Sequence, residues 1–372
     1  MKRIVLVGGG SGGHFYPLIA VAERLHSFSA QMPLKLYYFG PEPYDQALLD
    51  RHGIQFVHCP SGKKRKYASI HNIIDAFKLF FGFFVAIWKL YAIYPDVVFS
   101  KGSYTSVPVT IAAFLLRIPV VIHESDSKPG SANKLAAKFA RYIAISFDEV
   151  AQYFPQDKIA LTGIPLRSEL TLAVQDPFAQ LGLPQGRPLI FVTGGSLGAE
   201  RLNNLILESL DELLPQYTIL HQTGAIHEVG VGKTASTLIR NVDLLERYFV
   251  KGNLTGIEMN LALQAASLVI SRSGAGTIFE IAQKGKPAIL IPIPETVSHD
   301  QKTNAYAYAR TGAATVMEEK NFADGLLASE INRIMVDPAL YERMSAAAAR
   351  FGQADAALSI AQAIAGIAKE HG

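Results

Sequence analysis

The chain has 372 residues, of which 49% are apolar and 18% charged, and its formal net charge is +3. This length and composition exclude a disordered chain and predict two folded domains rather than one extended core. The single cysteine, Cys59, excludes an internal disulfide, and no Cys/His cluster has the spacing of a structural zinc site. We therefore expect a reducing compartment and no structural metal.

The N-terminal half is basic. Residues 1–163 carry 18 Lys and Arg against 11 Asp and Glu, whereas the remainder carries 17 against 21. This asymmetry fits an anionic substrate or surface, and equally an ordinary solvated face. The apolar run at residues 4–7 is too short for a secretory signal, so we expect a cytoplasmic protein.

Short apolar runs alternate with amphipathic segments along the chain. Strands are expected at residues 4–7, 34–39, 96–100, 119–122, 142–145 and 158–161, with helices between them. The pattern begins again at residues 188–193, which predicts a second unit. We expect an α/β protein with two Rossmann-like, doubly wound parallel-sheet domains, residues 1–163 and 164–346. An alanine-rich helix at about 347–372 would pack back on one of them.

Each predicted domain opens with a strand, a glycine-rich turn and a helix. The turns are Gly8–Gly13 and Gly194–Ala199. Free N–H groups and the positive end of the helix dipole bind anions at such a helix start. Two such turns on facing domains predict a cleft that holds phosphates from both sides.

The first turn also satisfies the dinucleotide pattern G-x-G-x-x-G. A nicotinamide-binding domain needs an acidic residue at the end of its second strand, where this chain has only Glu42 near Gly40-Pro41. An NAD(P)-dependent oxidoreductase is therefore disfavoured, and we expect no cofactor. The turn leads instead to His14, whose imidazole, with an ordinary pKa of about 6.5, suits a general base.

Polar residues follow other strands of the first half. The turn Ser100–Ser106 follows one strand, and His123–Asp126 follows the next. Ligands of parallel sheets gather at the carboxyl ends of strands, so these residues are expected to line one pocket with the first turn. Glu124 and Asp126 either orient an imidazole or bind a sugar hydroxyl, or they cap the helix near Ser131.

In the second half, Ser271–Thr277 leads into a helix that carries Glu280. The small residues allow a phosphate to approach the helix start, and Glu280 is placed to accept ribose hydroxyls. A helix dipole also favours an acidic residue in a first turn by roughly 0.3 to 1 kcal/mol without any ligand. Asp300 and Gln301, before a further helix, suit either sugar hydroxyls or capping.

Taken in order, these motifs resemble the MurG family of bacterial peptidoglycan glycosyltransferases, within glycosyltransferase family 28 and the GT-B fold. The likeness covers nearly the whole chain. It includes Gly9–His14 with Pro17, Gly102–Tyr104 with Pro108, His123-Glu124, Asn133-Lys134, Gly163–Arg167, Gly194–Ala199, Arg272–Ala275 with Glu280, and Asp300-Gln301 with Asn304-Ala305.

The resemblance implies inverting transfer of GlcNAc from UDP-GlcNAc to the C4 hydroxyl of lipid I, undecaprenyl-diphospho-N-acetylmuramoyl-pentapeptide, giving lipid II. It implies His14 as the catalytic base and Glu124 as its orienter or substitute. The substrate-binding residues it implies are Ser11, Gly12, Gly13, Tyr104, Asp126 and Asn133 for the acceptor, and Arg167, Ser196, Ala275, Gly276, Thr277, Glu280, Asp300 and Gln301 for the donor. Other cell-wall synthesis and division proteins are implied as partners, but no cofactor, metal or nucleic acid.

One residue departs from the family pattern. The family usually reads His-Glu-Gln-Asn where this chain has His123–Asp126. An acidic residue thus replaces a neutral amide in a site expected to hold a diphosphate. Either the acceptor contact differs, or Asp126 is paired or held neutral.

A membrane-facing segment is expected after the basic run Lys63–Lys66. The longest stretch without charge, 79–88, has ten residues, whereas a spanning helix needs about 20. Its six aromatics between Phe77 and Trp88 favour a helix at an anionic membrane surface, with one face in the core. The alternative is a helix wholly buried on the sheet. The resemblance implies a peripheral protein on the cytoplasmic face of the bacterial inner membrane.

Two related activities remain alternatives. One is transfer of a sugar to another lipid such as diacylglycerol, and the other is sugar-nucleotide epimerisation on a related fold. The first would share the donor turns and the membrane helix, whereas the second has no need of a lipid acceptor.

Overall fold

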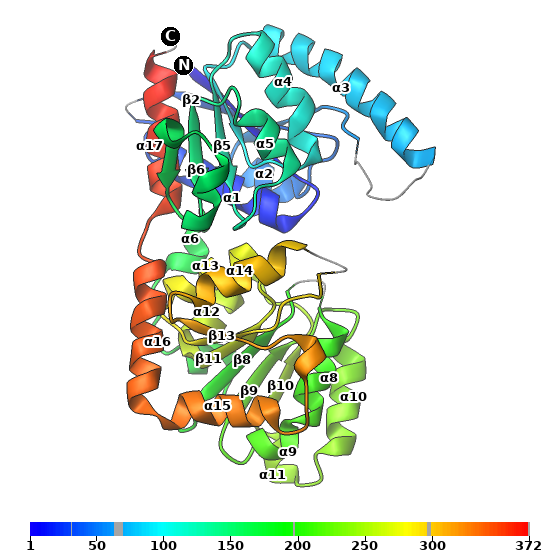
Figure 1. The fold of residues 1–372 in the computed structure, drawn as a ribbon, viewed down its shortest axis with the longest axis vertical. Coiled ribbons are helices and arrows are strands. Elements are labelled where there is room, and N and C mark those ends of the chain that lie inside the picture. The colour runs from blue at the N-terminus through cyan, green and yellow to red at the C-terminus, as the bar shows by residue number, and fades with distance from the viewer. Residues whose placement is uncertain (31, 63–69, 196–197, 296–298, 371–372) are drawn as a thin grey trace. The chain divides into compact units, whose positions relative to one another are not determined.

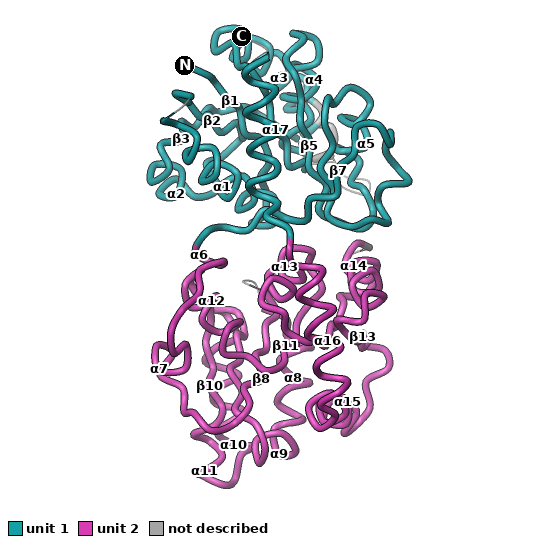
Figure 2. The backbone as a smooth tube through the Cα atoms, turned by 90° about the vertical axis from the view of Figure 1, so that its left-hand side faces the viewer, with its two compact units in different colours: residues 1–168, 354–372 teal, residues 169–353 magenta. Residues whose placement is uncertain are grey.

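The computed structural model describes residues 1–30, 32–62, 70–195, 198–295 and 299–370. The chain divides into two compact units, residues 1–168 with 354–372 and residues 169–353 (Figure 2). Each unit is built on one parallel sheet with helices between its strands (Figure 1). This confirms the predicted fold class of two doubly wound α/β domains.

Unit 1 has a seven-stranded sheet in the order β3-β2-β1-β4-β5-β6-β7. Its strands are β1 (Lys2–Val7), β2 (Leu34–Gly40), β3 (Ile54–His58), β4 (Val97–Ser100), β5 (Val120–Glu124), β6 (Tyr142–Ile145) and β7 (Ile159–Leu161). Its helices are α1 (Gly12–His26), α2 (Gln46–Arg51), α3 (Ile70–Ile93), η1 (Tyr104–Ser106), α4 (Val107–Leu115), α5 (Ser131–Ala136), η2 (Asp148–Tyr153), η3 (Gln156–Lys158) and α17 (Ala356–Glu370). The sequence analysis overlooked β3, an edge strand whose side chains are only partly buried.

Alternate residues of the strands fill two cores in unit 1. Ile4 and Leu6 of β1 pack with α1 and α17, whereas Val5 and Val7 pack with α3, α4 and α5. Both faces of the sheet are therefore covered, which explains why its strands are continuous apolar runs. The alanine-rich C-terminal segment packs on unit 1 through Ile360, Ile364 and their neighbours.

Unit 2 has a six-stranded sheet in the order β10-β9-β8-β11-β12-β13. Its strands are β8 (Leu189–Thr193), β9 (Thr218–Gln222), β10 (Tyr248–Lys251), β11 (Ala266–Ser271), β12 (Ala288–Leu290) and β13 (Ala314–Val316). Its helices are α7 (Pro177–Leu181), α8 (Glu200–Glu208), α9 (Leu210–Leu213), α10 (Glu228–Leu238), α11 (Val242–Leu245), α12 (Gly256–Ala265), α13 (Ala275–Gln283), α14 (His299–Ala309), η4 (Glu319–Asn321), α15 (Leu326–Val336) and α16 (Pro338–Phe351). The short helix α6 (Ser168–Thr171) lies where the chain leaves unit 1.

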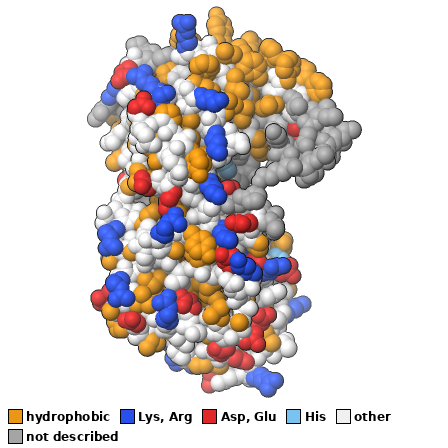
Figure 3. Space-filling model, viewed as in Figure 1, with side chains coloured by type: hydrophobic (Ala, Val, Ile, Leu, Met, Phe, Trp, Pro, Cys, Tyr) orange, Lys and Arg blue, Asp and Glu red, His pale blue; other side chains and the backbone are white. Residues whose placement is uncertain are grey.

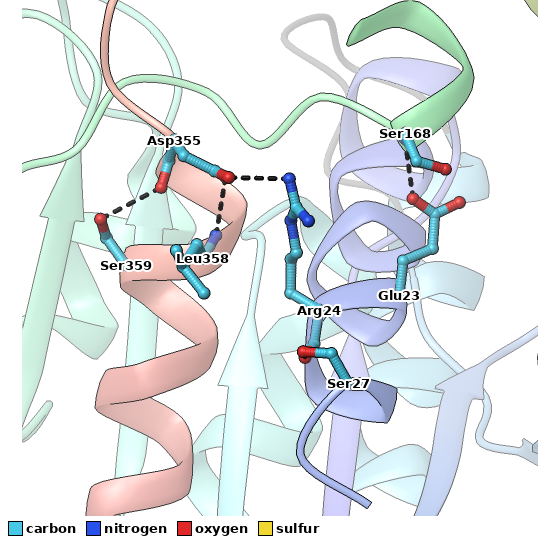
Figure 4. A network of polar contacts seen from close by, with 7 residues as sticks. All are labelled: Glu23, Arg24, Ser27, Ser168, Asp355, Leu358 and Ser359. Carbon is cyan, nitrogen blue, oxygen red and sulfur yellow. Dashed lines mark hydrogen bonds and ion pairs between the residues drawn. The ribbon is translucent and has the colours of Figure 1, made fainter. Parts of the chain in front are cut away.

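The unit boundaries differ from the predicted ones by a few residues. Residues 164–168 belong to unit 1, and the helix expected from 347 is two helices, of which α16 stays with unit 2. The chain passes between the units twice, near Ser168 and near Asp355, and both segments are hydrogen-bonded to α1 (Figure 4). Glu23 accepts the N–H of Ser168 at 2.8 Å, and Arg24 donates to Asp355 at 2.7 Å. Asp355 also caps α17 by accepting the N–H of Leu358 at 2.9 Å.

Candidate active site

The predicted site residues gather at the carboxyl edge of each sheet. The strand order reverses between β1 and β4 in unit 1 and between β8 and β11 in unit 2. Ligands of doubly wound sheets bind at such switch points. With the exception of Arg167, every predicted site residue lies at the end of, or after, one of these four strands or the next strand outward, β5 or β12.

In the turn after β1, close neighbouring atoms leave no room for a side chain at two of the glycines. A Cβ on Gly8 would lie 2.8 Å from Cβ of Lys101, and one on Gly9 would lie 2.7 Å from the Tyr38 hydroxyl. Gly13 is different, because it lies in the first turn of α1 and a Cβ there would meet nothing within 4 Å. Packing within the chain therefore gives no reason for a glycine at this position.

Tyr104 lies against the same turn. A Cβ on Gly10, which has a φ of 84°, would come within 3.1 Å of the Tyr104 ring. Burial raises the pKa of the Tyr104 phenol, with further contributions from Glu42 and Asp75. Tyr104 and the first turn, both predicted to hold the acceptor, are therefore in contact.

His14 lies in the first turn of α1, with its Nδ1 2.9 Å from the Ser11 hydroxyl. Ser11 occupies the N-cap position but makes no side-chain capping bond, so its hydroxyl serves the imidazole. Burial, and then the charge of Lys101, lower the pKa of His14 to about 4. The imidazole is therefore neutral at neutral pH, which is the state that a general base requires.

The loop after β5 is organised by the Glu124 carboxylate. This carboxylate is buried and accepts hydrogen bonds from the N–H of Asp126 at 3.1 Å, the N–H of Gly130 at 3.0 Å and the amide of Asn133 at 3.0 Å. Among the described residues, its hydrogen bonds all lie within its own loop and α5. These bonds give Glu124 a positioning role there, and its action on His14 stays a prediction.

Asn133 and His123 tie this loop to its surroundings. Asn133 donates to the carbonyl of His123 at 3.0 Å, and a Cβ on Gly102 would lie 2.9 Å from its amide. His123 is fully buried and its Nε2 donates to the carbonyl of Gly163 at 2.8 Å. Burial, and then Lys101, lower the pKa of His123 well below its usual value, so this ring is a neutral structural group.

Lys101 is a site residue that the sequence analysis did not single out. Its side chain is buried, and its Nζ donates to the hydroxyl of Ser125. Burial lowers the pKa of Lys101 to about 8, against the attraction of Glu124 and Asp126. Asp126, the departure from the family pattern, thus lies in the field of a lysine. The feature of the sequence that could have identified Lys101 is its position directly between an apolar strand and a glycine.

In unit 2, the turn after β8 is tightly packed. The N–H of Gly195 donates to the Thr193 hydroxyl at 3.1 Å. Gly198 has a φ of 73°, and a Cβ there would lie 2.2 Å from the carbonyl oxygen of Thr223. The predicted donor residue Ser196 lies outside the described residues.

The starts of α13 and α14 lie together. Ser273, just before α13, donates its hydroxyl proton to the carbonyl of Gln301, in the first turn of α14, at 2.8 Å. Ala275, Gly276 and Thr277 form the first turn of α13, and a Cβ on Gly276 would meet nothing within 4 Å. The structure thus brings the predicted diphosphate-binding turn to the predicted sugar-binding helix.

The acidic residues of this region occupy different positions in their helices. Glu280 lies beyond the first turn of α13, which contains no acidic residue, so the helix-dipole explanation for Glu280 is wrong. Its side chain is half-buried on the second turn. Asp300 is exposed in the first turn of α14. A place in the first turn of α14 is therefore a sufficient structural reason for Asp300. Glu280 has no such reason, because it lies beyond the first turn of α13.

Arg167 is not where the sequence analysis places it. That analysis assigns it to the donor-binding domain, whereas the structure groups it with unit 1. Its guanidinium stacks on the Tyr16 ring of α1, 4.2 Å from the ring centre. Such stacking is favourable for a planar cation and accounts for the segment's attachment to unit 1. Contact of Arg167 with a nucleotide diphosphate stays a prediction.

Helix α3 exposes a row of aromatic side chains that we call the aromatic face: Phe77, Phe80, Phe81, Phe84, Trp88 and Tyr91. Each is more than half exposed, and their spacing of three or four residues sets them on one side of the helix. On the other side, Ala86 and Leu90 are buried in the core with α4. Figure 3 shows hydrophobic side chains gathered over α3 and α4. The basic run Lys63–Lys66 lies outside the described residues.

No helix among the described residues is long and apolar enough to cross a membrane. In the same part of the chain, no three His, Cys, Asp or Glu side chains form a group that could hold a metal ion.

Known proteins resemble the chain along most of its length. Its residues 4–145 match the glycosyltransferase family 28 N-terminal domain, and residues 189–360 match the family's C-terminal domain. A Clostridium tetani protein named UDP-N-acetylglucosamine–N-acetylmuramyl-(pentapeptide) pyrophosphoryl-undecaprenol N-acetylglucosamine transferase is 34% identical, with 89% of each chain covered. A Bacillus cereus relative, named as transferase 2 of the same kind, is 35% identical and covers 92% of this chain and 94% of its own.

Solved structures share the fold. MurG of Acinetobacter baumannii has a TM-score of 0.79 at 24% identity, with 98% of this chain and 100% of that chain covered. A UDP-GlcNAc 2-epimerase from Neisseria meningitidis has a TM-score of 0.69 at 15% identity, with 98% and 100% covered. Because transferases and epimerases both have this fold, the fold alone does not decide between the two activities.

Proposed function

The chain belongs to glycosyltransferase family 28, and from this premise we propose that it transfers GlcNAc from UDP-GlcNAc to lipid I, forming lipid II. The observation that carries the proposal is the identity of about a third, over nine-tenths of the chain, to enzymes named for this reaction. The reacting groups are the C4 hydroxyl of the N-acetylmuramoyl residue and C1 of GlcNAc, with inversion and release of UDP.

The donor half of the site is proposed in unit 2. The first turn of α13 offers N–H groups that have no partner within the helix and an open approach at Gly276, which suit the UDP diphosphate. Glu280, one turn further, would accept the ribose hydroxyls, and Asp300 with Gln301 would bind the GlcNAc hydroxyls. Negative charge on the departing UDP would be stabilised by the same helix start.

The acceptor half is proposed in unit 1. The first turn of α1, with Gly12 and the open Gly13, would hold the lipid diphosphate, with Tyr104 beside it. His14, neutral and bonded to Ser11, would take the proton from the attacking hydroxyl. The hydroxyl then attacks C1 of the sugar while the bond to UDP breaks, so one proton moves to the imidazole and no covalent enzyme intermediate forms.

We propose further that the aromatic face of α3 lies in the interface of an anionic membrane, on its cytoplasmic side. Rings that are more than half exposed in one row on a helix otherwise fixed to the core suit insertion at headgroup level. The test is binding to vesicles that contain an anionic phospholipid. Replacing Phe81, Phe84 and Trp88 by serine should weaken binding by at least about tenfold, since each buried aromatic contributes about 1.5–3 kcal/mol.

The matched control replaces exposed apolar residues of unit 2, Ile226, Val242 and Val336, by serine. This control should bind vesicles as the unaltered protein does, and equal losses in both variants would reject the proposed surface.

The transfer itself is tested with radiolabelled UDP-GlcNAc and a short-chain lipid-linked N-acetylmuramoyl-pentapeptide, with diacylglycerol as a parallel acceptor. Product on the muramoyl lipid alone supports the proposal. Product on diacylglycerol alone, or epimerised UDP-sugar without transfer, rejects it in favour of one of the two alternatives.

A further inference from the structure

Lys101 is the one lysine buried in the described part of the chain, with 2% of its surface exposed. It directly follows β4 at the switch point of unit 1, and its Nζ donates to Ser125 in the turn after β5. Burying a cation is unfavourable unless polar groups offset its charge. None of the roles assigned above to the acceptor half explains this residue.

Unit 2 has a cation at the same place in its sheet. The N–H of Lys101 donates to the carbonyl of Val7, the last residue of β1, at 2.8 Å. The N–H of Arg272 donates to the carbonyl of Thr193, the last residue of β8, at 3.3 Å. Each cation is also the first residue after its strand, β4 or β11. A buried cation is therefore a shared feature of both switch points.

The two cations are offset by different groups. Arg272 forms an ion pair with Glu319 at 2.6 Å, and Glu319, which is not one of the predicted site residues, lies in the short helix η4 after β13. The carboxylates that attract Lys101 are those of Glu124 and Asp126. These lie at the end of β5 and in the turn after it, within the proposed acceptor half. The charge of Lys101 is thus matched inside the site itself.

The position of Lys101 beside two carboxylates affects how the site can bind an anion. A lipid diphosphate is anionic, and two carboxylates on the adjoining turn would repel it. A cation placed among the carboxylates lowers that repulsion, strongly so where water is excluded. The same cation makes an acidic residue tolerable where the family usually has a neutral amide.

We propose that Lys101 is a positioning residue of the acceptor site, whose ammonium is the counter-charge that lets the Glu124–Asp126 turn lie beside the anionic diphosphate of the acceptor. The proposal rests on the proposed function. It assigns the acidic Asp126 and the buried Lys101 to one electrostatic unit, so that each requires the other.

The charge of Lys101 is expected to change near neutral pH. The titratable groups that face it are Glu124 and Asp126, which attract it, and His14 and His123, whose pKa values it lowers. Both imidazoles are neutral at pH 7 and above. Since burial brings the pKa of Lys101 to about 8, its ammonium is present below about pH 8 and is lost above it. The KM for the lipid acceptor should rise through that range, while the KM for UDP-GlcNAc stays level.

The experiment compares the unaltered enzyme with Lys101→Met and with the double variant Lys101→Met/Asp126→Asn. Lys101→Met should raise the KM for the muramoyl lipid by about tenfold, equal to about 1.4 kcal/mol, with little change in the KM for UDP-GlcNAc. The double variant should recover to within about threefold of the unaltered enzyme, because it removes both the cation and one carboxylate. A purely structural lysine would instead lower stability and leave the acceptor KM unchanged.

Two outcomes overturn the proposal: an unchanged acceptor KM in Lys101→Met, or a double variant no better than the single one. If Lys101→Met does not fold, the pH series on the unaltered enzyme decides, and an acceptor KM that is flat across about pH 8 overturns it. The failure of the proposed function looks different, because the unaltered enzyme would then give no product on the muramoyl lipid.

Discussion

The turns after β4 in unit 1 and β11 in unit 2 both begin with a buried cation, but they differ in how that cation is paired and in backbone strain. In unit 2, Arg272 is fixed by Glu319 and by backbone carbonyls, and Gly274 has a relaxed φ of −62°. In unit 1, Lys101 is offset by the site's own carboxylates. Ser103, at the position equivalent to Gly274, has φ 72° and ψ 163°, which costs a residue other than glycine about 1–3 kcal/mol. Unit 2 thus has an unstrained turn whose cation is paired outside the predicted site residues, and unit 1 has a strained turn with a titratable cation beside the proposed base.

Each unit has, directly after a strand at its switch point, a helix whose first turn contains a glycine without a packing reason. Gly13 in α1 and Gly276 in α13 each lie in a first helical turn where a Cβ would meet nothing. At the switch point of a parallel sheet, where ligands bind, an open glycine at a helix start favours the approach of a ligand. The comparison therefore predicts that one glycine serves the acceptor and the other the donor.

The largest effect is expected at His14, which has no counterpart in the turn of unit 2. His14→Ala should lower kcat by about 10²- to 10⁴-fold, because the base is lost, and should leave the affinity for UDP unchanged. Single-turnover transfer and calorimetric titration with UDP measure the two quantities. Turnover like that of the unaltered enzyme would contradict the assignment and move the base elsewhere.

The pH profile sharpens the same assignment. The base must be unprotonated, and the pKa of His14 is lowered from 6.5 to about 4. Activity should therefore be level from pH 7 down to about 5 and fall only as the pH approaches 4. A fall of kcat/KM centred near pH 6.5 in the folded enzyme would show that His14 is not the group that titrates, or that its environment is more open.

The two cations should differ in their contribution to stability. Arg272→Met removes one of the two arginines that pair with the buried Glu319 carboxylate, leaving Arg201 on the other oxygen, and should lower the free energy of unfolding by about 1–3 kcal/mol. Lys101→Met should cost less, because backbone and amide N–H groups already satisfy Glu124. Urea denaturation measures both losses. The control Arg272→Met/Glu319→Gln should regain part of the loss, and equal losses for the two single variants would break the comparison.

Substitutions at Gly13 and Gly276 test separately whether α1 binds the acceptor and α13 binds the donor. Gly13→Ala should raise the KM for the lipid acceptor, and Gly276→Ala the KM for UDP-GlcNAc, each by about tenfold or more. Each change should also stabilise its helix by about 0.5–1 kcal/mol, so a loss of activity cannot be ascribed to unfolding.

Matched controls exist in both units. Gly366 in α17 and Gly230 in α10 are helical, exposed and equally open. Alanine at either should stabilise its helix and leave both KM values unchanged. If Gly13→Ala and Gly276→Ala behave like these controls, neither helix start binds substrate.

The smallest expected effect concerns strain. Ser103→Gly should raise the free energy of unfolding by about 1 kcal/mol, because glycine adopts positive φ without penalty. Ser27→Gly, at a residue with φ −63°, should instead lower it. Thermal unfolding distinguishes the two. A destabilised Ser103→Gly would mean that the serine side chain, rather than the backbone, determines the turn.

The sequence predicted the parts of the fold and site that depend on local pattern. Apolar runs and glycine turns were enough to predict the two sheets and the place of His14 at the end of the first glycine turn. Arg167 was misplaced because its unit depends on stacking with Tyr16, 151 residues earlier in the chain, which no local pattern encodes. Lys101 was overlooked because its burial depends on the pairing of β4 with β5. The local sequence, a lysine between a strand and a glycine, does not show that pairing.

The central claim, that the donor nucleotide is held by unit 2 and the acceptor by unit 1, is tested most directly by amide hydrogen exchange with and without UDP. We expect UDP to protect the N–H groups at the start of α13, from Ala275 to Ile278, and at the start of α14. We expect no protection at Gly12–Phe15 in α1. Protection confined to the start of α1 would contradict the division of the site between the two units.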